Sequence, residues 1–364
     1  MNANQAKICV VIGTRAQLIK TAPVMQEMQK RGIAYYFLHT GQHNDTFKET
    51  LDDFGLPEPD AVVVDWGQEA KTVASLARWS TRAFLALRHG SSYLPFSDGI
   101  VLVHGDTPSA VWGTFLGKLT RNRVFHLESG LRSFNIFQPF PEELIRVFLP
   151  YIVDIYACPG EWALANINKQ KGEKINTIQN TAVDGLRYIL ETFPDSGDRK
   201  KPFVLASFHR VENMYNDERL RQIVDTIEQT ANNYHIIFPM HPLTKSRLIK
   251  NGYMDRLISN ANVELCDRLP YAQFIPLLDQ AEFLLTDSGS MQEEIVWLGL
   301  PMLVFRDATE RKEGIGENVI LSHYDPQIID SFLDNPQTYR RDRHFPNISP
   351  SSIVVDWLED TLGL

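Results

Sequence analysis

The sequence predicts an α/β protein made of two doubly wound domains, each with a parallel sheet between layers of helices. Short apolar runs alternate with longer amphipathic or Ala/Leu-rich segments along the chain. A polar Pro/Gly segment at 193–202 divides this alternation into two sets, and 364 residues suit about two domains. We therefore expect domains at residues 1–192 and 202–349, followed by a closing C-terminal helix in 350–364 that packs back on the first domain.

Strands are expected where short runs rich in branched or aromatic residues are bounded by turn residues. Trp357 and Leu358 lie among acidic residues in Ile353–Leu362, which predicts an amphipathic helix at the end of the chain. Ligands of open α/β sheets bind beyond the carboxyl ends of the strands, so we expect the two domains to face a common cleft. The predicted strands are Ile8–Ile12, Tyr35–His39, Ala61–Val64, Ile100–His104, Val124–Leu127 and Ile152–Ala157, then Phe203–Ser207, Ile236–Pro239, Val263–Cys266, Phe283–Thr286 and Met302–Phe305.

The composition is that of a soluble globular enzyme, with 43% hydrophobic and 22% charged residues. No stretch approaches the ~18 unbroken apolar residues of a membrane span, and residues 1–7 are polar, so we expect a cytoplasmic protein that binds no membrane. The net charge of −9 opposes nonspecific binding to nucleic acid. Cys9, Cys158 and Cys266 lie in apolar runs without zinc or disulfide spacing and are expected to be small core residues.

The segment Thr286–Glu294 follows a predicted strand and precedes an apolar helical pattern. A Ser/Gly turn that opens a helix leaves backbone N–H groups at the positive end of the helix dipole, which favours phosphate. Glu293 or Glu294 is suited to accept both hydroxyls of a ribose. Capping of the helix by Asp287 or Ser288 explains the same residues equally well when this segment is taken alone.

Acidic residues recur at strand and helix ends in the first domain. Asp106 follows the strand that ends at His104, Glu128 follows the strand that ends at Leu127, and Glu142 opens a further helix. Any one of them suits a capping or surface role, but three at consecutive termini favour acid/base chemistry.

Basic residues and histidines also follow predicted strands, as these acidic residues do. Arg15 and Lys20 follow the first strand and suit phosphate, although two solvated cations at a turn explain them as well. His209 beside an arginine suits a polyanion, whereas His241 equally suits a histidine satisfied at a turn. The absence of a G-x-G-x-x-G pattern disfavours a dinucleotide cofactor.

Taken together, these clusters resemble the non-hydrolysing UDP-N-acetylglucosamine 2-epimerases over nearly the whole chain, from about residue 8 to residue 320. The matching motifs, in chain order, are Gly13-Thr14-Arg15, Thr40-Gly41-Gln42-His43, His104-Gly105-Asp106-Thr107, Glu128-Ser129-Gly130-Leu131-Arg132, Pro141-Glu142-Glu143 with Arg146, His209-Arg210-Val211-Glu212-Asn213, His241-Pro242, Asp287-Ser288-Gly289 with Gln292-Glu293-Glu294, and Thr309-Glu310-Arg311.

The resemblance implies a glycosyltransferase-B-like fold of two Rossmann-like domains and inversion at C2 of a UDP-linked N-acetylhexosamine, without metal or nicotinamide. In that family UDP is eliminated to give a 2-acetamidoglucal and then adds to the opposite face. The implied partners are a UDP-sugar and a second copy of the chain. By position, Asp106, Glu128 and Glu142 resemble the acid/base carboxylates, His209 the histidine that assists departure of UDP, and Arg15, Lys20, Ser288, Gly289, Ser290, Glu294, Tyr271, His241 and Arg311 the substrate-binding residues.

Other functions stay open. A hydrolysing relative would release free N-acetylmannosamine and UDP, but Gly13-Thr14-Arg15 and Pro141-Glu142-Glu143 favour the non-hydrolysing type. A glycosyltransferase or a non-catalytic nucleotide-sugar binding protein would not need three carboxylates in the first domain. Ala16-Gln17 and Ser290 depart from the family's usual pattern. The substituents at C3, C5 and C6 of the sugar, and the carboxylate that serves each face, are not specified by the sequence.

Overall fold

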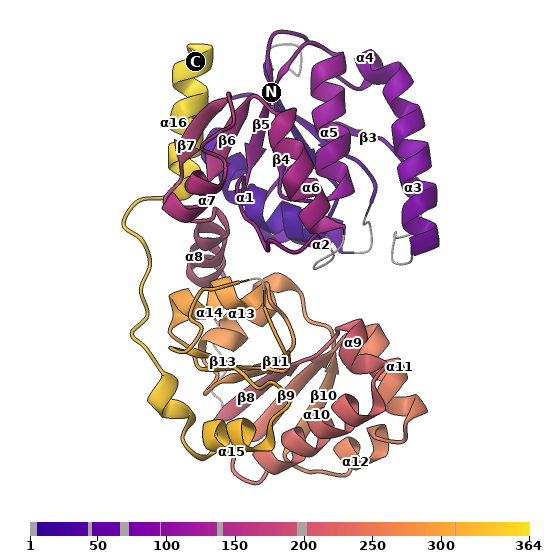
Figure 1. Ribbon diagram of the computed structural model, residues 1–364, viewed down its shortest axis with the longest axis vertical. Helices are drawn as coiled ribbons and strands as arrows, with labels where there is room; N and C mark the ends of the chain where they lie inside the picture. The colour runs from indigo at the N-terminus through magenta and orange to yellow at the C-terminus, as the bar shows by residue number, and fades with distance from the viewer. Residues whose placement is uncertain are drawn as a thin grey trace. The chain divides into compact units, whose positions relative to one another are not determined.

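The computed structural model describes residues 6–42, 46–65, 73–94, 96–136, 141–194, 202–309 and 311–364. The chain forms two compact units (Figure 1): unit 1 comprises Met1–Tyr188 with Pro346–Leu364, and unit 2 comprises Ile189–Phe345. Most of the predicted linker, together with His43 and Glu310, lies outside the described residues.

Unit 1 contains a parallel sheet with the strand order β3-β2-β1-β4-β5-β6-β7. Strands β1 (Ile8–Ile12) and β4 (Ile100–His104) are buried at every position, as expected for a sheet covered on both faces. The strand order reverses between these two, so their carboxyl ends flank the crevice where such sheets bind ligands. The other strands are β2 (Tyr36–His39), β3 (Ala61–Val62), β5 (Arg123–Leu127), β6 (Ile155–Cys158) and β7 (Glu173–Asn176).

The helices of unit 1 cover this sheet (Figure 1). Thr14 starts the first helix with a capping box, since its hydroxyl accepts from Gln17 N while the Gln17 side chain accepts from Thr14 N. Gly113 lets another helix lie close to the sheet, because a Cβ there would come within 2.7 Å of Val103 Cγ1. The helices are α1 (Arg15–Lys30), α2 (Phe47–Asp53), α3 (Val73–Ala86), α4 (Gly90–Tyr93), α5 (Pro108–Leu119), α6 (Glu142–Phe148), α7 (Glu161–Asn166) and α16 (Pro350–Leu362), together with the first part of α8 (Ala182–Thr192), which runs on into unit 2 at Ile189.

The C-terminal helix α16 belongs to unit 1, where it packs against α1 (Figure 1). Arg31 Nη1 lies 2.6 Å from both Asp356 Oδ1 and Glu359 Oε2, and the Trp357 ring lies 5.1 Å from that of Phe125. These contacts fix the end of the chain on the unit in which the chain begins.

Unit 2 repeats the architecture with a parallel sheet in the order β10-β9-β8-β11-β12-β13. Its order reverses between β8 and β11, which places the crevice beyond their carboxyl ends. The strands are β8 (Phe203–Ser207), β9 (His235–Met240), β10 (Val263–Asp267), β11 (Leu284–Thr286), β12 (Met302–Val304) and β13 (Val319–Leu321), and the helices are α9 (Val211–Met214), α10 (Asp217–Thr230), α11 (Pro242–Lys250), α12 (Met254–Ile258), α13 (Tyr271–Asp279), α14 (Met291–Leu298) and α15 (Pro326–Asp334).

The structure adds two strands that the sequence did not predict. Both β7 and β13 lie at sheet edges, where strands are short and tolerate polar residues, and β7 reads Glu-Lys-Ile-Asn. Strand β6 begins at Ile155 rather than at Ile152 because Leu149–Tyr151 forms a 3-10 turn before it. Among the described residues, no helix is long and apolar enough to cross a bilayer.

Candidate active site

Two of the predicted carboxylates lie at the carboxyl ends of adjacent strands in unit 1. Asp106 follows β4 through Gly105, and Glu128 follows β5 directly. Glu128 has a φ of 58°, a left-handed conformation that is uncommon for a non-glycine residue. This turn is held on both sides, since Gly105 N donates to Leu127 O at 3.0 Å and Ser129 N donates to Ala157 O at 2.9 Å. The direction of the Glu128 side chain is therefore set by the sheet.

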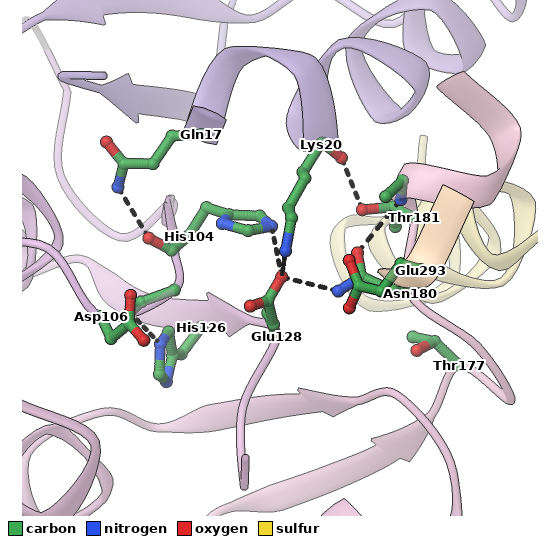
Figure 2. Close-up of polar contacts among 12 residues, drawn as sticks. Gln17, Lys20, His104, Asp106, His126, Glu128, Thr177, Asn180, Thr181 and Glu293 are labelled. Carbon is green, nitrogen blue, oxygen red and sulfur yellow. Dashed lines mark hydrogen bonds and ion pairs between the residues drawn. The ribbon is translucent and has the colours of Figure 1, made fainter. Parts of the chain in front are cut away.

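Three side chains surround the Glu128 carboxylate (Figure 2). Lys20 Nζ and Asn180 Nδ2 donate to Glu128 Oε2 at 2.5 Å and 2.6 Å, and His104 Nε2 lies 3.6 Å from the same oxygen. The Glu128 side chain is only 6% exposed. Charge-assisted bonds of this kind offset the cost of burying a carboxylate.

Asp106 is paired with an arginine of α6. Arg146 Nε and Nη2 each lie 2.6 Å from Asp106 Oδ2, and the Asp106 side chain is 20% exposed. The next acid along α6, Glu143, is fully buried and accepts from Arg132 Nε at 2.6 Å and from two backbone N–H groups of the loop after β5. These bonds outweigh burial and lower the pKa of Glu143. Glu143 thus anchors a loop, whereas its half-buried neighbour Glu142 is the residue predicted for catalysis.

Two buried histidines connect the loops that carry these acids. Burial lowers the pKa of His104 to about 4 and also lowers that of His126, so both rings are neutral at pH 7. His126 Nε2 bonds to Gly105 O at 2.8 Å, and its Nδ1 accepts from the Ser129 hydroxyl at 3.1 Å. Because Gly105 precedes Asp106 and Ser129 follows Glu128, this ring fixes the spacing of the two acidic loops.

In unit 2, Asp287 is fully buried just beyond β11 and organises the loop after β8. Its carboxylate accepts from His209 N, Arg210 N and Asn213 Nδ2, each at 3.0 Å. The side chain of His209 remains 43% exposed, and desolvation lowers its pKa, with Arg210 and Arg268 acting in the same direction against Asp287. A polyanion bound at this ring would oppose that shift and favour the protonated form.

The Ser/Gly turn lies between β11 and α14, as predicted. Ser288 N donates to Thr286 Oγ1 at 3.0 Å, and the hydroxyls of Ser288 and Ser290 are 3.0 Å apart. Ser290 has no side-chain cap bond to α14. The Asp287 carboxylate bonds to the loop after β8 and the Ser288 hydroxyl to that of Ser290, so these contacts do not cap α14, and its start keeps the backbone geometry that suits an anion.

The two glutamates of α14 differ in their surroundings. Glu293 is buried and pairs with Arg311, while Thr309 Oγ1 donates to Gln292 Oε1 at 2.6 Å. These contacts fasten the loop after β12 to α14. The structure therefore gives Glu293 a structural partner, and the predicted ribose contact of Glu294, one position further along, stays a prediction.

The other predicted substrate-binding residues also lie at element starts. Arg15 begins α1, Tyr271 begins α13, and His241 caps α11 through its Nδ1, which accepts from Leu243 N at 3.3 Å. The His241 and His209 rings lie 5.9 Å apart. Lys20, predicted to contact the diphosphate, is instead bonded to Glu128, so its phosphate contact stays a prediction.

Asn180 is the residue at this site that sequence reasoning missed. It precedes α8 and follows β7, the polar edge strand that the apolar pattern did not reveal. A search for polar residues after predicted strands would have found it only once β7 was recognised. Among the described residues, no group of three or more His, Cys, Asp or Glu side chains is placed to hold a metal ion.

A separate hollow of about 550 Å³ lies at the other end of the unit 1 sheet, near the amino ends of its strands. It is lined by both apolar and polar residues, namely Leu87, Arg88, Gly90, Leu94, Phe96, Ser97, Leu119 and Thr120. These described lining residues include no carboxylate or histidine for acid/base chemistry, and the hollow is separate from the carboxylates described above.

Comparison with known proteins identifies the family. Residues 26–344 match the UDP-N-acetylglucosamine 2-epimerase family. The chain is 32% identical over 343 residues to a UDP-N-acetylglucosamine 2-epimerase of Salmonella borreze, covering 89% of this chain and 87% of that one. It is 29% identical over 337 residues to a UDP-2,3-diacetamido-2,3-dideoxy-D-glucuronate 2-epimerase of Pseudomonas aeruginosa, covering 89% and 91% of the two chains.

A solved structure agrees with these matches. The UDP-GlcNAc 2-epimerase of Neisseria meningitidis, bound to UDP-GlcNAc, superposes with a TM-score of 0.81 at 28% identity and covers 97% of this chain and 99% of that chain. Its likeness confirms the predicted fold class of two doubly wound, glycosyltransferase-B-like units. The chain is therefore an enzyme of the UDP-N-acetylglucosamine 2-epimerase family.

Proposed function

We propose that this enzyme inverts C2 of UDP-N-acetylglucosamine to give UDP-N-acetylmannosamine, by elimination of UDP and its re-addition to a 2-acetamidoglucal. The observation that carries the proposal is a pair of carboxylates at adjacent strand ends, each held by a cation: Asp106 by Arg146 and Glu128 by Lys20. Such groups are fixed in place and are suited to exchange a proton with a substrate.

The chemistry requires leaving-group departure and proton removal together. No carbonyl acidifies the C2 proton, so a carboxylate takes it as the C1–O bond breaks and its electrons leave with UDP. In the return step the oxygen of UDP bonds to C1 of the glucal, and C2 receives a proton on the opposite face. One acid on each face, drawn from Asp106, Glu128 and Glu142, accounts for inversion without any change in oxidation state.

Unit 2 is proposed to bind UDP. The Ser288–Ser290 turn at the start of α14 supplies backbone N–H groups for the diphosphate, and His209 donates to the departing phosphate once an anion favours its protonated form. Glu294 and Tyr271 are proposed to contact ribose and uracil. The fixed backbone around Asp287 supports this role, since it places His209 before substrate arrives.

A second candidate substrate is a UDP-sugar with a further acetamido group and a carboxylate. The Pseudomonas aeruginosa relative, whose name specifies such a sugar, is 29% identical over 337 residues, close to the 32% of the Salmonella borreze enzyme. Overall identity therefore does not choose between the two sugars. We further propose that the enzyme is a cytoplasmic homodimer and that its product is a precursor of surface polysaccharide. Light scattering after gel filtration tests whether the protein is a dimer.

The proposal is tested by incubating the protein with UDP-GlcNAc and following the sugar by proton NMR and the diphosphate by phosphorus NMR. We expect two UDP-linked hexosamines that differ in configuration at C2, with both phosphorus signals of the linkage retained. Free N-acetylmannosamine and UDP would identify a hydrolysing enzyme instead. Turnover of the diacetamido uronate alone would support the second substrate, and binding of both sugars without turnover would contradict the proposal.

A further inference from the structure

The amide of Asn180 has its orientation fixed by the backbone. Asn180 Oδ1 accepts from Ala182 N at 3.0 Å, a local bond of the kind that asparagine makes at the start of a helix. A backbone N–H can only donate, so the atom that faces it must be the oxygen. The nitrogen, Nδ2, is therefore the atom that lies 2.6 Å from Glu128 Oε2 (Figure 2).

The next residue fastens the same segment to α1. Thr181 Oγ1 donates to the backbone oxygen of Lys20 at 2.5 Å, while Lys20 Nζ donates to Glu128 Oε2 at the same distance. The start of α8 thus holds both the carboxylate and the helix turn that carries its cation. Glu128 also has a left-handed backbone, so its direction depends on being held from several sides.

From this geometry we infer that Asn180 is a positioning residue for Glu128, donating a hydrogen bond that keeps the carboxylate anionic and aimed for proton transfer at C2. The inference rests on the proposed function and takes Glu128 as one of the carboxylates that exchange that proton. Asn180 itself need not touch the substrate, because it acts through Glu128.

Asn180→Asp separates positioning from helix capping. Aspartate keeps an oxygen for Ala182 N but replaces the donor by a second anion facing Glu128. Among the described residues, the charged or titratable groups around Glu128 include Lys20 on α1, His104 at the end of β4, Asp106 after it and His126 on β5. Among these, only Lys20 is cationic at pH 7, so an added negative charge makes the anionic form of Glu128 harder to reach.

A matched control exists four residues earlier. Asn176 Oδ1 accepts from Ile178 N at 2.8 Å, and its Nδ2 donates to Glu161 Oε1 at 2.6 Å, which repeats the Asn180 geometry at an exposed pair that includes no predicted catalytic residue. Asn176→Asp therefore makes the same chemical change in solvent. We expect it to leave kcat, KM and the pH profile unchanged.

The experiment measures epimerisation from pH 5 to pH 9 for the wild type, N180D, N180A and N176D. The substrate is UDP-GlcNAc or, if only the diacetamido uronate is turned over in the NMR test, that UDP-sugar. For N180D we expect kcat at pH 7 to fall about tenfold to a hundredfold with KM within about threefold, and the acid limb of kcat/KM to move up by about one pH unit. N180A, which adds no charge, should show a smaller shift in the same direction. Thermal unfolding of each variant shows which ones are folded.

The inference would be overturned if folded N180D and N180A kept the wild-type acid limb of kcat/KM. It would also be overturned if N180D and N176D lost equal amounts of kcat. If N180D does not fold, the acid limb of N180A decides the question in the same way. A wild type that epimerises no UDP-hexosamine would instead overturn the proposed function and this inference with it. The two failures are therefore distinguishable.

Discussion

The two units share an architecture but use their carboxylates in opposite ways. In unit 1, Glu128 and Asp106 lie just beyond the carboxyl ends of strands and are paired with the side chains of Lys20 and Arg146. In unit 2, Asp287 at the corresponding position is fully buried and accepts from two backbone N–H groups and an amide. A carboxylate paired with a movable side chain is available for proton exchange, whereas one bonded to backbone N–H groups builds a rigid loop.

Position at a strand end does not by itself assign a role to an acidic residue. The partner decides, because backbone donors cannot leave without unfolding the loop, whereas lysine and arginine side chains can reorient around a ligand. Glu143 of unit 1 follows the pattern of Asp287, since it is fully buried and accepts from two backbone N–H groups.

The largest effect is expected for Glu128→Gln. Removal of a general acid/base should lower kcat about 10²- to 10⁴-fold, with the affinity for UDP-sugar within about threefold. The variant's free energy of unfolding should fall by about 1–2 kcal/mol, because the glutamine amide oxygen can still accept from Lys20 and Asn180 at this shielded position, where the Glu128 side chain is 6% exposed. Steady-state kinetics measures kcat, calorimetry measures the affinity for the UDP-sugar, and urea unfolding measures the stability. Glu161→Gln, at an exposed acid, is the control, and an E128Q enzyme with wild-type kcat would refute the assignment.

Asp287→Asn should show the reverse pattern. The amide nitrogen of asparagine would face backbone donors in a fully buried site, so the free energy of unfolding should fall by about 3 kcal/mol. Urea unfolding measures this loss, and UDP affinity should fall with it because the His209 loop loses its anchor. If D287N were as stable as E128Q, the contrast between the units would not hold.

Because His104 is buried and neutral, we expect unit 1 to become less stable at acidic pH. Its pKa is about 4 in the folded protein, against an ordinary value of 6.5, because burial disfavours the charged ring. Below pH 6.5 the unfolded chain binds a proton that the folded chain does not, so stability falls as pH drops from about 6.5 to about 4. The loss due to this residue should be about 2 kcal/mol at pH 5 and about 3 kcal/mol in full.

The variant His104→Asn removes that titration. Urea unfolding at pH 7 and pH 5 should show a smaller loss of stability between the two pH values for the variant than for the wild type. Because only the change in the free energy of unfolding between pH 7 and pH 5 is compared, a packing cost of the substitution that is the same at both pH values cancels. An equal change in the variant and the wild type would mean that His104 is not the group that resists protonation.

The smallest effect is expected for Ser290→Gly, which restores the glycine that the family pattern usually has. Ser290 has a φ of −66°, so its backbone needs no glycine, and its side chain does not cap α14. UDP affinity should therefore stay within about threefold, as measured by calorimetry. A loss of tenfold or more would show that the Ser290 hydroxyl, rather than the backbone of the turn, holds the ligand.

Much of the fold follows from the sequence because buried parallel strands are continuous apolar runs, as in Ile8–Ile12 and Ile100–His104. The edge strands β7 and β13 could not be recognised in this way, since β7 is mostly polar and β13, although apolar, is only three residues long. Missing β7 hid Asn180, whose contact with Glu128 joins residues 52 positions apart. Sequence periodicity carries no information on such pairs.

The same limit applies to neighbouring acids. The sequence places Glu142 and Glu143 together at a helix start, but only the packing shows that Glu143 turns inward to Arg132. Likewise Glu293 pairs with Arg311 across 18 positions of chain. Strand-end position was therefore predictable, whereas the identity of each partner required the tertiary structure.

The central claim is that the carboxylates of unit 1 exchange the C2 proton of a UDP-sugar. The most direct measurement is proton NMR of UDP-GlcNAc incubated with the enzyme in heavy water. We predict that deuterium enters C2 of both the recovered substrate and the epimeric product, with incorporation lost in E128Q. Epimeric product that forms with its C2 proton retained would contradict the claim.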